Sequence, residues 1–439
     1  MTCSEWLSSE KAITKSRKNY SHFDYRVDLS NCKDYISDPN KVAEHGFYPF
    51  IHYKKQTIKY NGKTRQKKTK NRDICYAAHL DRCIYQYYSY ILNELYNSCV
   101  YQNGISDVPI AYRTDLGKSN IYFAHKAFEY IRTHKPCYIM IGDFTGFFDN
   151  LDHSYLKQMW CQLIGCPCLP QDHYNIYKNV TKYSTWDRSD ILALNGLEDN
   201  QKGIDKLNKK ERVLTTEQFN HNKAQIHKNQ SKYGIPQGSP ISAVLANLYM
   251  MDIDKQIHDT IHPLEGMFMR YSDDFIVILP VHEQEKDMEV IKSITRMIND
   301  TPGLTLQPEK TQYFYCDESH LTNCGEQFHT NADSRNSAVC FLGFSFDGNK
   351  VSIRSKTITK YYYRMYRKAK NIVKAREKQP QDDRPSTENL YRRYSERGAY
   401  GKKGNFFTYV NNAKKEFGSQ ENIDHDTRKH MQKIRKALK

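Results

Sequence analysis

Two adjacent carboxylates, Asp273 and Asp274, lie between short apolar runs in the stretch MRYSDDFIVIL. Asp is disfavoured in strands, and two charged carboxylates held against apolar flanks repel each other. A third acid, Asp143, ends another apolar run, CYIMIGD. Three carboxylates brought to one place can hold two Mg²⁺ ions for an in-line phosphoryl transfer. A lone Asp pair is by default a solvated turn, so the rest of the sequence must decide between the two interpretations.

The acids need a framework of strands and helices to bring them together. The run 137–144 indicates a buried strand whose tip carries Asp143, and the Asp pair is predicted at the tip of a hairpin. Helices are predicted over 119–134, 239–257 and 285–300, and further strands over 303–315 and 340–353. This order predicts an α+β domain with an antiparallel sheet of the split βαβ type.

Two other regions flank this predicted domain. The arms around Asn61-Gly62 alternate and predict a hairpin, and 74–96 has helical periodicity. Residues 186–231 are polar and indicate an insertion or an elaborated surface region. From Thr359 onward the pattern is helical and basic, and it closes with a helix over 426–439.

Positive charge is concentrated in two of these regions. The net charge is +16, and residues 351–439 carry 24 Lys and Arg against 9 Asp and Glu, a balance of +15. A second cluster, 54–72, holds nine basic residues and no acid. The 34 tyrosines interleave with the cations, as in KYYYRMYRKAK over 360–370. Rings alternating with cations are typical of nucleic-acid binding, so a polyanion is the expected partner.

The composition also indicates the compartment. No apolar run approaches the roughly 20 residues of a membrane span. The start, MTCSEWLSSEKA, has no signal pattern, so we expect a cytoplasmic protein without a membrane partner. Twelve scattered cysteines indicate reduced thiols there. The cluster Cys161, Cys166 and Cys168 has no second pair at zinc-finger spacing, which argues against a structural metal.

Seven motifs, in order over residues 54–344, resemble the conserved blocks of reverse transcriptases, in particular the bacterial group that includes group II intron, retron, abortive-infection and defence-associated enzymes. They are KNRDI, AYRTDLGKSN, DFTGFFDNLDH, GIPQGSPISAVLANLYM, YSDD, LTLQPEKT and FLGF. The resemblance implies a right-hand polymerase with fingers over 1–135, a palm over 136–345 and a basic helical thumb over 346–439. The region 157–232 would be a fingers or insertion element within the palm.

The resemblance also implies roles for single residues. Asp143, Asp273 and Asp274 would be catalytic and would bind two Mg²⁺, with Mn²⁺ as an alternative. The nucleotide site would comprise Arg72, Arg113, Phe148, Gln237, Gly238 and Lys310. Phe148 would be the steric gate that excludes a ribose 2′-hydroxyl. Nucleic-acid contacts are expected from Lys67, Lys68, Tyr362, Arg364, Tyr366, Arg367 and Lys368.

Several of these residues have simpler explanations. Arg113 could equally be a structural ion-pair partner, and Lys310 a solvated lysine at a strand end. Phe147, beside the gate, is by default a core residue. Asp149 and Asp152 are expected as capping or surface acids rather than ligands.

Tyr271 and Phe148 favour DNA synthesis over RNA synthesis, because RNA-dependent RNA polymerases usually show Gly-Asp-Asp and a smaller gate residue. No Cys/His nuclease pattern follows the thumb, and the retron motifs are missing. The sequence most resembles the abortive-infection and defence-associated branch, which implies a bacterial antiphage enzyme copying a dedicated non-coding RNA into cDNA from dNTPs. A retron-like or intron-derived enzyme with another role, and a polymerase-shaped RNA-binding protein, are the alternatives. The primer, the oligomeric state and any partner protein stay open.

Overall fold

The structure, a computed structural model, describes residues 2–61, 66–328, 337–378 and 385–439. The chain divides into two compact units. The first unit comprises residues 1–115, 144–256 and 296–305, and the second comprises 116–143, 257–295 and 306–439. Helices α14 (Met251–Ile261) and α15 (Gln284–Asp300) run across the division.

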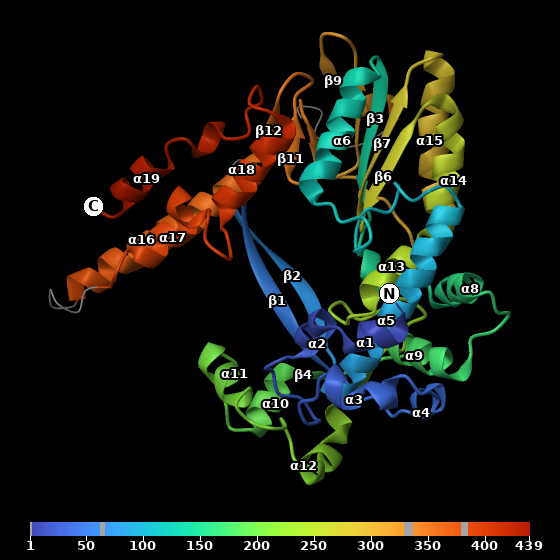
Figure 1. The fold of residues 1–439 in the computed structure, drawn as a ribbon, viewed down its shortest axis with the longest axis vertical. Helices are drawn as coiled ribbons and strands as arrows, with labels where there is room; N and C mark the ends of the chain where they lie inside the picture. Colours follow the sequence, from blue (N-terminus) through green and yellow to red (C-terminus); the bar gives the residue numbers. More distant parts are fainter. Residues whose placement is uncertain (1, 62–65, 329–336, 379–384) are drawn as a thin grey trace. The chain divides into compact units, whose positions relative to one another are not determined.

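The second unit contains a five-stranded antiparallel sheet in the order β6-β7-β3-β8-β9 (Figure 1). Its strands are β3 (Cys137–Asp143), β6 (Met267–Tyr271), β7 (Asp274–Pro280), β8 (Gln312–Cys316) and β9 (Leu321–Asn323). Strands β3 and β7 lie inside the sheet and are almost fully buried, which explains their continuous apolar runs. The predicted strand, the hairpin and the α+β class are confirmed.

One predicted strand is shorter than expected. Residues 303–311 form turns and irregular backbone, and β8 begins only at Gln312. Pro308 lacks the N–H that a sheet ladder needs. The amide of Gln307 donates instead to the Asp143 carbonyl at the tip of β3, at 2.8 Å.

The pairing of β3 with β7 depends on a glycine. Gly142 lies opposite Phe275, and a Cβ on Gly142 would stand 2.2 Å from Cζ of the Phe275 ring. We expect Gly142→Ala to destabilise the protein by about 1–3 kcal/mol, because the ring has to move within a packed sheet. Chemical denaturation measures this change. Gly46→Ala is the matched control, since no heavy atom lies within 4 Å of its added Cβ. Equal stability of the two variants would contradict the tight packing.

A small sheet and four helices follow in the second unit. The sheet comprises β10 (Val339–Phe341), β11 (Phe344–Phe346) and β12 (Val351–Ile353). Leu342 and Gly343 both have positive φ, 47° and 95°, as a two-residue type I′ hairpin requires. Phe346 stacks on Phe128 of α6 (Asn120–Thr133), with the ring centroids 5.4 Å apart.

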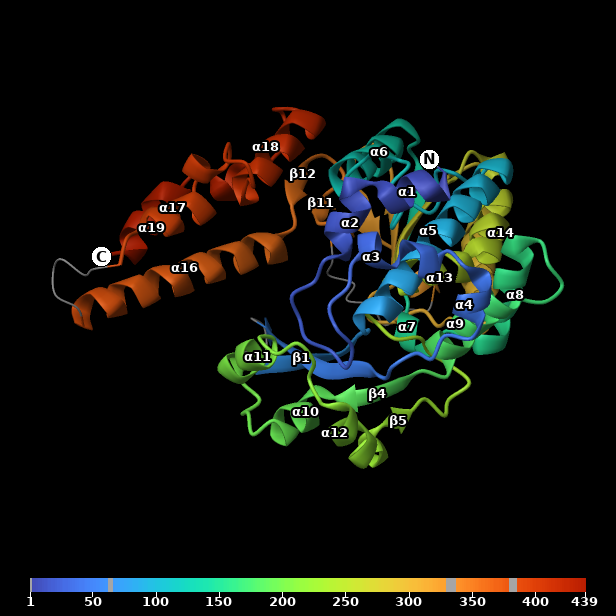
Figure 2. The same cartoon turned by 60° about the horizontal axis from the view of Figure 1, so that its bottom comes forward.

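The helices of this C-terminal region are α16 (Ser355–Lys378), α17 (Glu388–Tyr394), α18 (Phe406–Phe417) and α19 (His430–Ala437). Figure 2 shows α17 and α19 alongside the long α16. The buried side chains of α16 recur at helical spacing and pack against these helices. The basic helical region predicted from the sequence is therefore confirmed as helical, and its last helix starts four residues later than predicted.

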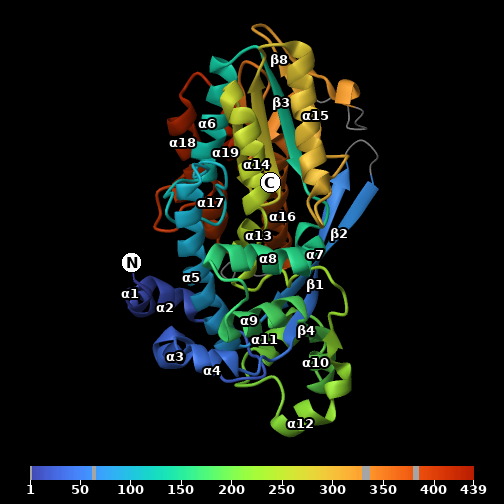
Figure 3. The same ribbon diagram turned by 90° about the vertical axis from the view of Figure 1, so that its right-hand side faces the viewer.

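The first unit is built on the hairpin of β1 (Phe50–Asn61) and β2 (Gln66–Tyr76). The pair Asn61 and Gln66 is the last pair before the turn, and the predicted turn residue Gly62 lies outside the described residues. β4 (Ser184–Asp187) adds in parallel to β1 (Figure 3). β5 (His227–Lys228) pairs with β4 and completes the sheet. The helix predicted over 74–96 is α5 (His79–Gln102); its first residues belong to β2 instead, where Ile74 pairs with Tyr53.

Helices make up the rest of the first unit. The N-terminal ones are α1 (Cys3–Ser8), α2 (Glu10–Ser16), α3 (Leu29–Ile36) and α4 (Pro39–Ala43). The later ones are α7 (Phe147–Asn150), α8 (His153–Ile164), α9 (Gln171–Thr181), α10 (Arg188–Leu194), α11 (Gln201–Leu207), α12 (Thr216–His221) and α13 (Ser242–Tyr249). The predicted helix over 239–257 is thus divided between α13 and α14.

Residues 186–231 are not merely a polar surface region. Trp186 is fully buried and packs in a hydrophobic cluster with Phe23 and Ile51. Its indole N–H donates to Oε1 of Gln225 at 3.1 Å. The cluster is completed by Ile191, Leu192, Leu207, Val213 and Leu214. Residues 186–231 therefore share a core with β1 and the N-terminal segment.

None of the helices in the described ranges is both long enough and apolar enough to cross a lipid bilayer.

Candidate active site

The three predicted catalytic acids converge at one end of the five-stranded sheet in the second unit. Asp143, the last residue of β3, is the direct cross-strand partner of Asp274, the first residue of β7. Side chains of such partners stand about 5 Å apart at Cβ. Asp273 occupies the two-residue turn between β6 and β7, next to Asp274. The hairpin therefore presents both acids to the tip of β3.

Two features hold the turn between β6 and β7. Ser272 adopts a positive φ of 62°, which lets the chain reverse within two residues. The guanidinium of Arg270, fully buried in β6, donates to the Ser272 carbonyl at 3.1 Å. Arg270 was not among the predicted site residues, although a cation inside the otherwise apolar strand MFMRY was a usable signal.

Each carboxylate of the cluster disfavours ionisation of its neighbours and so raises their pKa values. Burial, together with the neighbouring Asp273 and Asp143, raises the pKa of Asp274 to about 6. Burial and Asp143 also raise the pKa of Asp273. Lys310 compensates in part, because its Nζ lies 2.6 Å from Oδ2 of Asp143. Lys310 is therefore an exposed lysine that also forms an ion pair with a catalytic candidate.

The donor set suits a hard divalent cation. Carboxylate oxygens are the ligands that Mg²⁺ prefers, and the cluster carries more negative charge than Lys310 can neutralise. Within the described residues, no three His, Cys, Asp or Glu side chains already form a ready metal site. Asp143 is engaged by Lys310 instead, so the carboxylates have to reorient around an ion.

The raised pKa of Asp274 gives a pH-dependent stability. Because the folded protein disfavours the charged carboxylate, Asp274 contributes stability below its ordinary pKa of 3.8, and this contribution is lost as the pH rises through about 6. With EDTA, we expect Asp274→Asn to melt above the wild type at pH 7, with the difference shrinking toward about pH 4. Calorimetry measures both melting temperatures. Glu285→Gln, at an exposed position, is the control. If the difference in melting temperature between Asp274→Asn and the wild type did not change with pH, the mutual effect of the clustered carboxylates would be refuted.

Three nucleotide-site candidates lie together in the first unit. Arg72 is an exposed residue of β2. Three residues further along β2, the Cys75 amide donates to the Gln237 carbonyl at 2.9 Å. Gly238 has a φ of 116°, and a Cβ there would stand 2.5 Å from the Cys75 carbonyl oxygen. Only glycine fits this approach, so the Pro-Gln-Gly loop is seated on the strand that carries Arg72.

The two phenylalanines of GFFD differ in exposure. Phe147 is buried, at 4 % exposed, whereas Phe148 is partly exposed at the surface of the first unit. Phe147 is therefore the core residue, and Phe148 has a face available for a ligand. Asp152 caps α8 by accepting from the Tyr155 amide at 2.7 Å, as expected of a capping acid.

Arg113 is a structural residue in this arrangement. Its guanidinium is buried, pairs with Asp115 at 2.6 Å and donates to the Ser106 carbonyl at 2.6 Å. It also donates to Oδ1 of Asn97 at 3.1 Å. A guanidinium with this many partners is poorly placed to bind a nucleotide. The structure thus favours the ion-pair interpretation of Arg113.

The expected nucleic-acid contacts of α16 separate into two faces. Arg364, Tyr366 and Arg367 are exposed, and Lys368 is half-buried. Tyr362 is instead buried, and the Lys433 ammonium covers its ring, with Nζ 3.8 Å from the ring centroid.

Three further residues are Tyr363 on α16 and the two lysines expected in the β1–β2 hairpin, Lys67 and Lys68. The exposed face of α16 also carries Tyr363, which sequence analysis assigned to no role. Lys67 and Lys68 pair with Tyr60 and Lys59 in the β1–β2 hairpin, and their side chains lie outside the described residues.

An antiparallel sheet with an Asp pair in a hairpin turn, beside a third Asp at the tip of the central strand, defines the palm of a right-hand polymerase. Residues 54–346, about two thirds of the chain, match the family described as "Reverse transcriptase (RNA-dependent DNA polymerase)". The chain therefore belongs to the reverse transcriptase family.

Structural comparison finds telomerases. The apo telomerase of Candida tropicalis truncated from its C-terminal domain is 11 % identical, with a TM-score of 0.41, and the match covers 75 % of this chain and 61 % of that one. The telomerase of Candida albicans in complex with a fragment of telomeric RNA is 11 % identical, with a TM-score of 0.38, and the match covers 95 % and 68 %. The chain thus spans about three fifths of the first of these proteins. No curated protein matches the sequence.

Proposed function

We propose that this protein is an RNA-directed DNA polymerase in which Asp143, Asp273 and Asp274 hold two Mg²⁺ ions, with Mn²⁺ as an alternative. The observation that carries the proposal is the convergence of these three carboxylates at one end of the sheet, in a chain of the reverse transcriptase family. Such ions, when bound, activate a primer 3′-hydroxyl and neutralise the triphosphate during in-line transfer.

The chain's own residues position the reactants in this proposal. Lys310 releases Asp143 when the cluster is neutralised, and its ammonium then binds the triphosphate as a point charge. From the resemblance to reverse transcriptases, we assign Arg72 to the incoming triphosphate, and Gln237 and Gly238 to the template and the incoming base. Phe148 blocks the ribose 2′-hydroxyl. Arg113 supports the first unit from within its buried network.

We assign the fingers to residues 1–135, the palm to 136–345 and the thumb to 346–439. The exposed cations of α16 would follow the backbone of the template–product duplex, with the exposed Tyr366 and Tyr363 beside them. We assign Tyr362 to packing within the thumb, because Lys433 covers its ring.

For the cellular role, we propose antiphage defence in the bacterial cytoplasm, with a dedicated non-coding RNA as the template. Support comes from the resemblance of RDICYAAHLDRCIYQYYSYILNELY and of the AYRTDLGKSN motif to the defence-associated and abortive-infection branch.

The test is to purify the protein from cells that carry its native locus and to sequence the RNA and DNA that accompany it. A defined small RNA together with its complementary DNA is the expected result. RNA without any DNA would favour a polymerase-shaped RNA-binding protein and overturn the proposal.

The defence role has a separate test. Cells carrying the double substitution Asp273→Ala and Asp274→Ala should lose protection against phage, measured by plaque counts. Unchanged protection by this variant would show that catalysis is not required for defence.

A further inference from the structure

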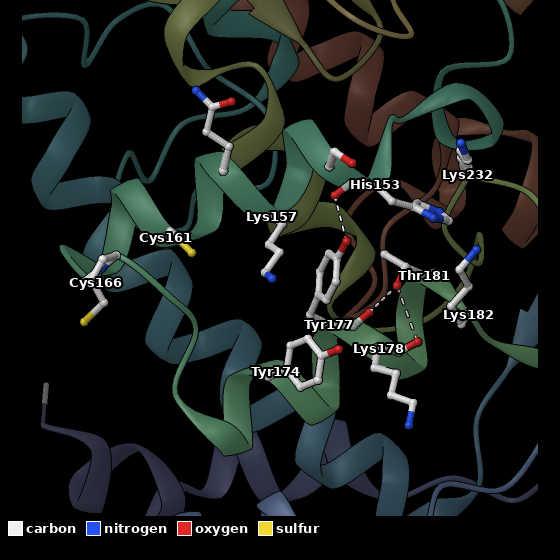
Figure 4. Close-up of a pocket in the computed structure, with 13 residues that line it drawn as sticks. His153, Lys157, Cys161, Cys166, Tyr174, Tyr177, Lys178, Thr181, Lys182 and Lys232 are labelled. Atoms are coloured by element: carbon white, nitrogen blue, oxygen red, sulfur yellow. Dashed lines mark hydrogen bonds between the residues drawn. The ribbon is translucent and has the colours of Figure 1, made fainter.

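A pocket of about 820 Å³ lies between α8 and α9 in the first unit (Figure 4). None of the catalytic or nucleotide-site candidates lines it. Its lining includes four lysines, Lys157, Lys178, Lys182 and Lys232, and no acidic residue. Below we call it the α8–α9 pocket.

The lining side chains occupy one face of each helix. On α9, Tyr174, Tyr177, Lys178 and Thr181 recur at the spacing of a single helical face, and Lys182 follows directly as the C-cap residue. On α8, His153, Lys157 and Cys161 recur every four residues. Two facing helix surfaces therefore both present polar and cationic side chains instead of the apolar residues that usually join helices.

The rings and the cations of the pocket are close to one another. Nζ of Lys157, on α8, lies 5.4 Å from the ring centroid of Tyr174, on α9. The Tyr174 and Tyr177 rings are stacked, with their centroids 6.2 Å apart. Tyr174 is 42 % exposed, so part of this side chain is accessible to a ligand.

The walls of the pocket are fixed by hydrogen bonds, one of which engages Lys182. The Tyr177 hydroxyl donates to the His153 carbonyl at 2.9 Å, which ties α9 to α8. The His153 ring bonds the Gly234 carbonyl at 2.8 Å. Lys182 donates to the Ser231 carbonyl at 2.8 Å, and Lys178, Lys182 and Lys232 are all exposed. The pocket thus combines a ring platform with several positive charges.

We propose that the α8–α9 pocket binds single-stranded RNA, a segment of the bound RNA that is not being copied. A base would stack on Tyr174, and the flanking phosphates would contact Lys157 and Lys178. The volume lies within the range of small-molecule sites, which admits one or two nucleotides but not a duplex. Stacking accepts every base, so the site would hold RNA with little sequence preference. The inference rests on the proposed function only in taking RNA as the ligand.

Binding of a fluorescein-labelled ten-residue oligouridine, measured by anisotropy, tests the charges. The double substitution Lys157→Ala and Lys178→Ala should weaken binding roughly tenfold at 0.1 M salt and reduce the salt slope by about 1.4. The matched control, Lys202→Ala with Lys206→Ala, removes the same charge from the exposed surface of α11 in the same unit. Equal losses in both double variants would show a general charge effect and overturn the proposal.

The ring has its own test. Tyr174→Ala should weaken oligouridine binding roughly five- to hundredfold, whereas Tyr174→Phe should bind as the wild type does, because stacking needs the ring and not the hydroxyl. Circular dichroism establishes that both variants are folded. Unchanged binding by a folded Tyr174→Ala would overturn the stacking role.

Two cysteines in the lining allow occupancy to be measured without any substitution. Saturating oligouridine should slow the alkylation of Cys161 and Cys166 by iodoacetamide several-fold. Mass spectrometry measures the extent of alkylation at each cysteine over time. Cys3 and Cys168 are exposed, do not line the pocket and serve as references. Equal protection of all four, or the same protection by inorganic phosphate alone, would overturn a site for RNA.

The same variants separate this inference from the proposed function. Primer extension on a short primer–template should be unchanged by the α8–α9 pocket substitutions. A wild-type protein without DNA synthesis would refute the proposed polymerase, while the binding and alkylation comparisons would still decide the pocket.

Discussion

Replacing Asp274 with Asn should abolish DNA synthesis while leaving the protein folded and, without metal, more heat-stable. The substitution keeps the shape of the side chain but removes one negative charge from the cluster. Within this cluster, burial and the neighbouring carboxylates raise the pKa values of Asp273 and Asp274. Loss of a metal ligand should lower primer-extension rates by roughly 10³-fold or more. Single-turnover extension with an RNA template and dNTPs measures the loss.

The control is Glu285→Gln, which removes a carboxylate from the exposed first turn of α15. It should extend primers at the wild-type rate. Oligouridine binding by the Asp274→Asn variant should also be unchanged, which separates loss of chemistry from loss of folding. An active Asp274→Asn enzyme would refute the assignment of the cluster as the catalytic centre.

Replacing Phe148 with Ala should admit ribonucleotides. The partly exposed ring of Phe148 is the proposed obstacle to a 2′-hydroxyl, so removing it should increase the efficiency of ribonucleotide incorporation relative to deoxynucleotides by roughly a hundredfold. Extension assays with one nucleotide at a time, comparing rGTP with dGTP, measure the ratio. Synthesis with dNTPs should continue, because the three carboxylates are untouched.

Phe147→Leu is the matched control for the gate. Phe147 is buried, so its substitution should lower stability without changing the sugar preference. If Phe147→Leu changed the preference and Phe148→Ala did not, the roles of the two rings would be reversed.

Much of the second unit could be predicted from the sequence because its signals are local. A central strand is buried on both faces, so the sequences of β3 and β7 are continuous apolar runs. The hairpin of FLGF depends on two adjacent residues with positive φ. The core around Trp186 could not be predicted in this way. Its partners Phe23 and Ile51 lie more than a hundred residues away, and the local sequence there is polar.

By itself, the sequence determined the three acids, their position at strand ends and the order of the family motifs. Such chemistry requires particular residue types at fixed local spacing, and these can be recognised in the sequence alone. Only the tertiary structure decided that Lys310 pairs with Asp143, that Arg270 supports the turn and that Arg113 is buried. It also decided which tyrosines of α16 face the core and that α8 and α9 form one basic pocket. These features depend on contacts between distant segments and on the rotation of each helix, which periodicity alone does not fix.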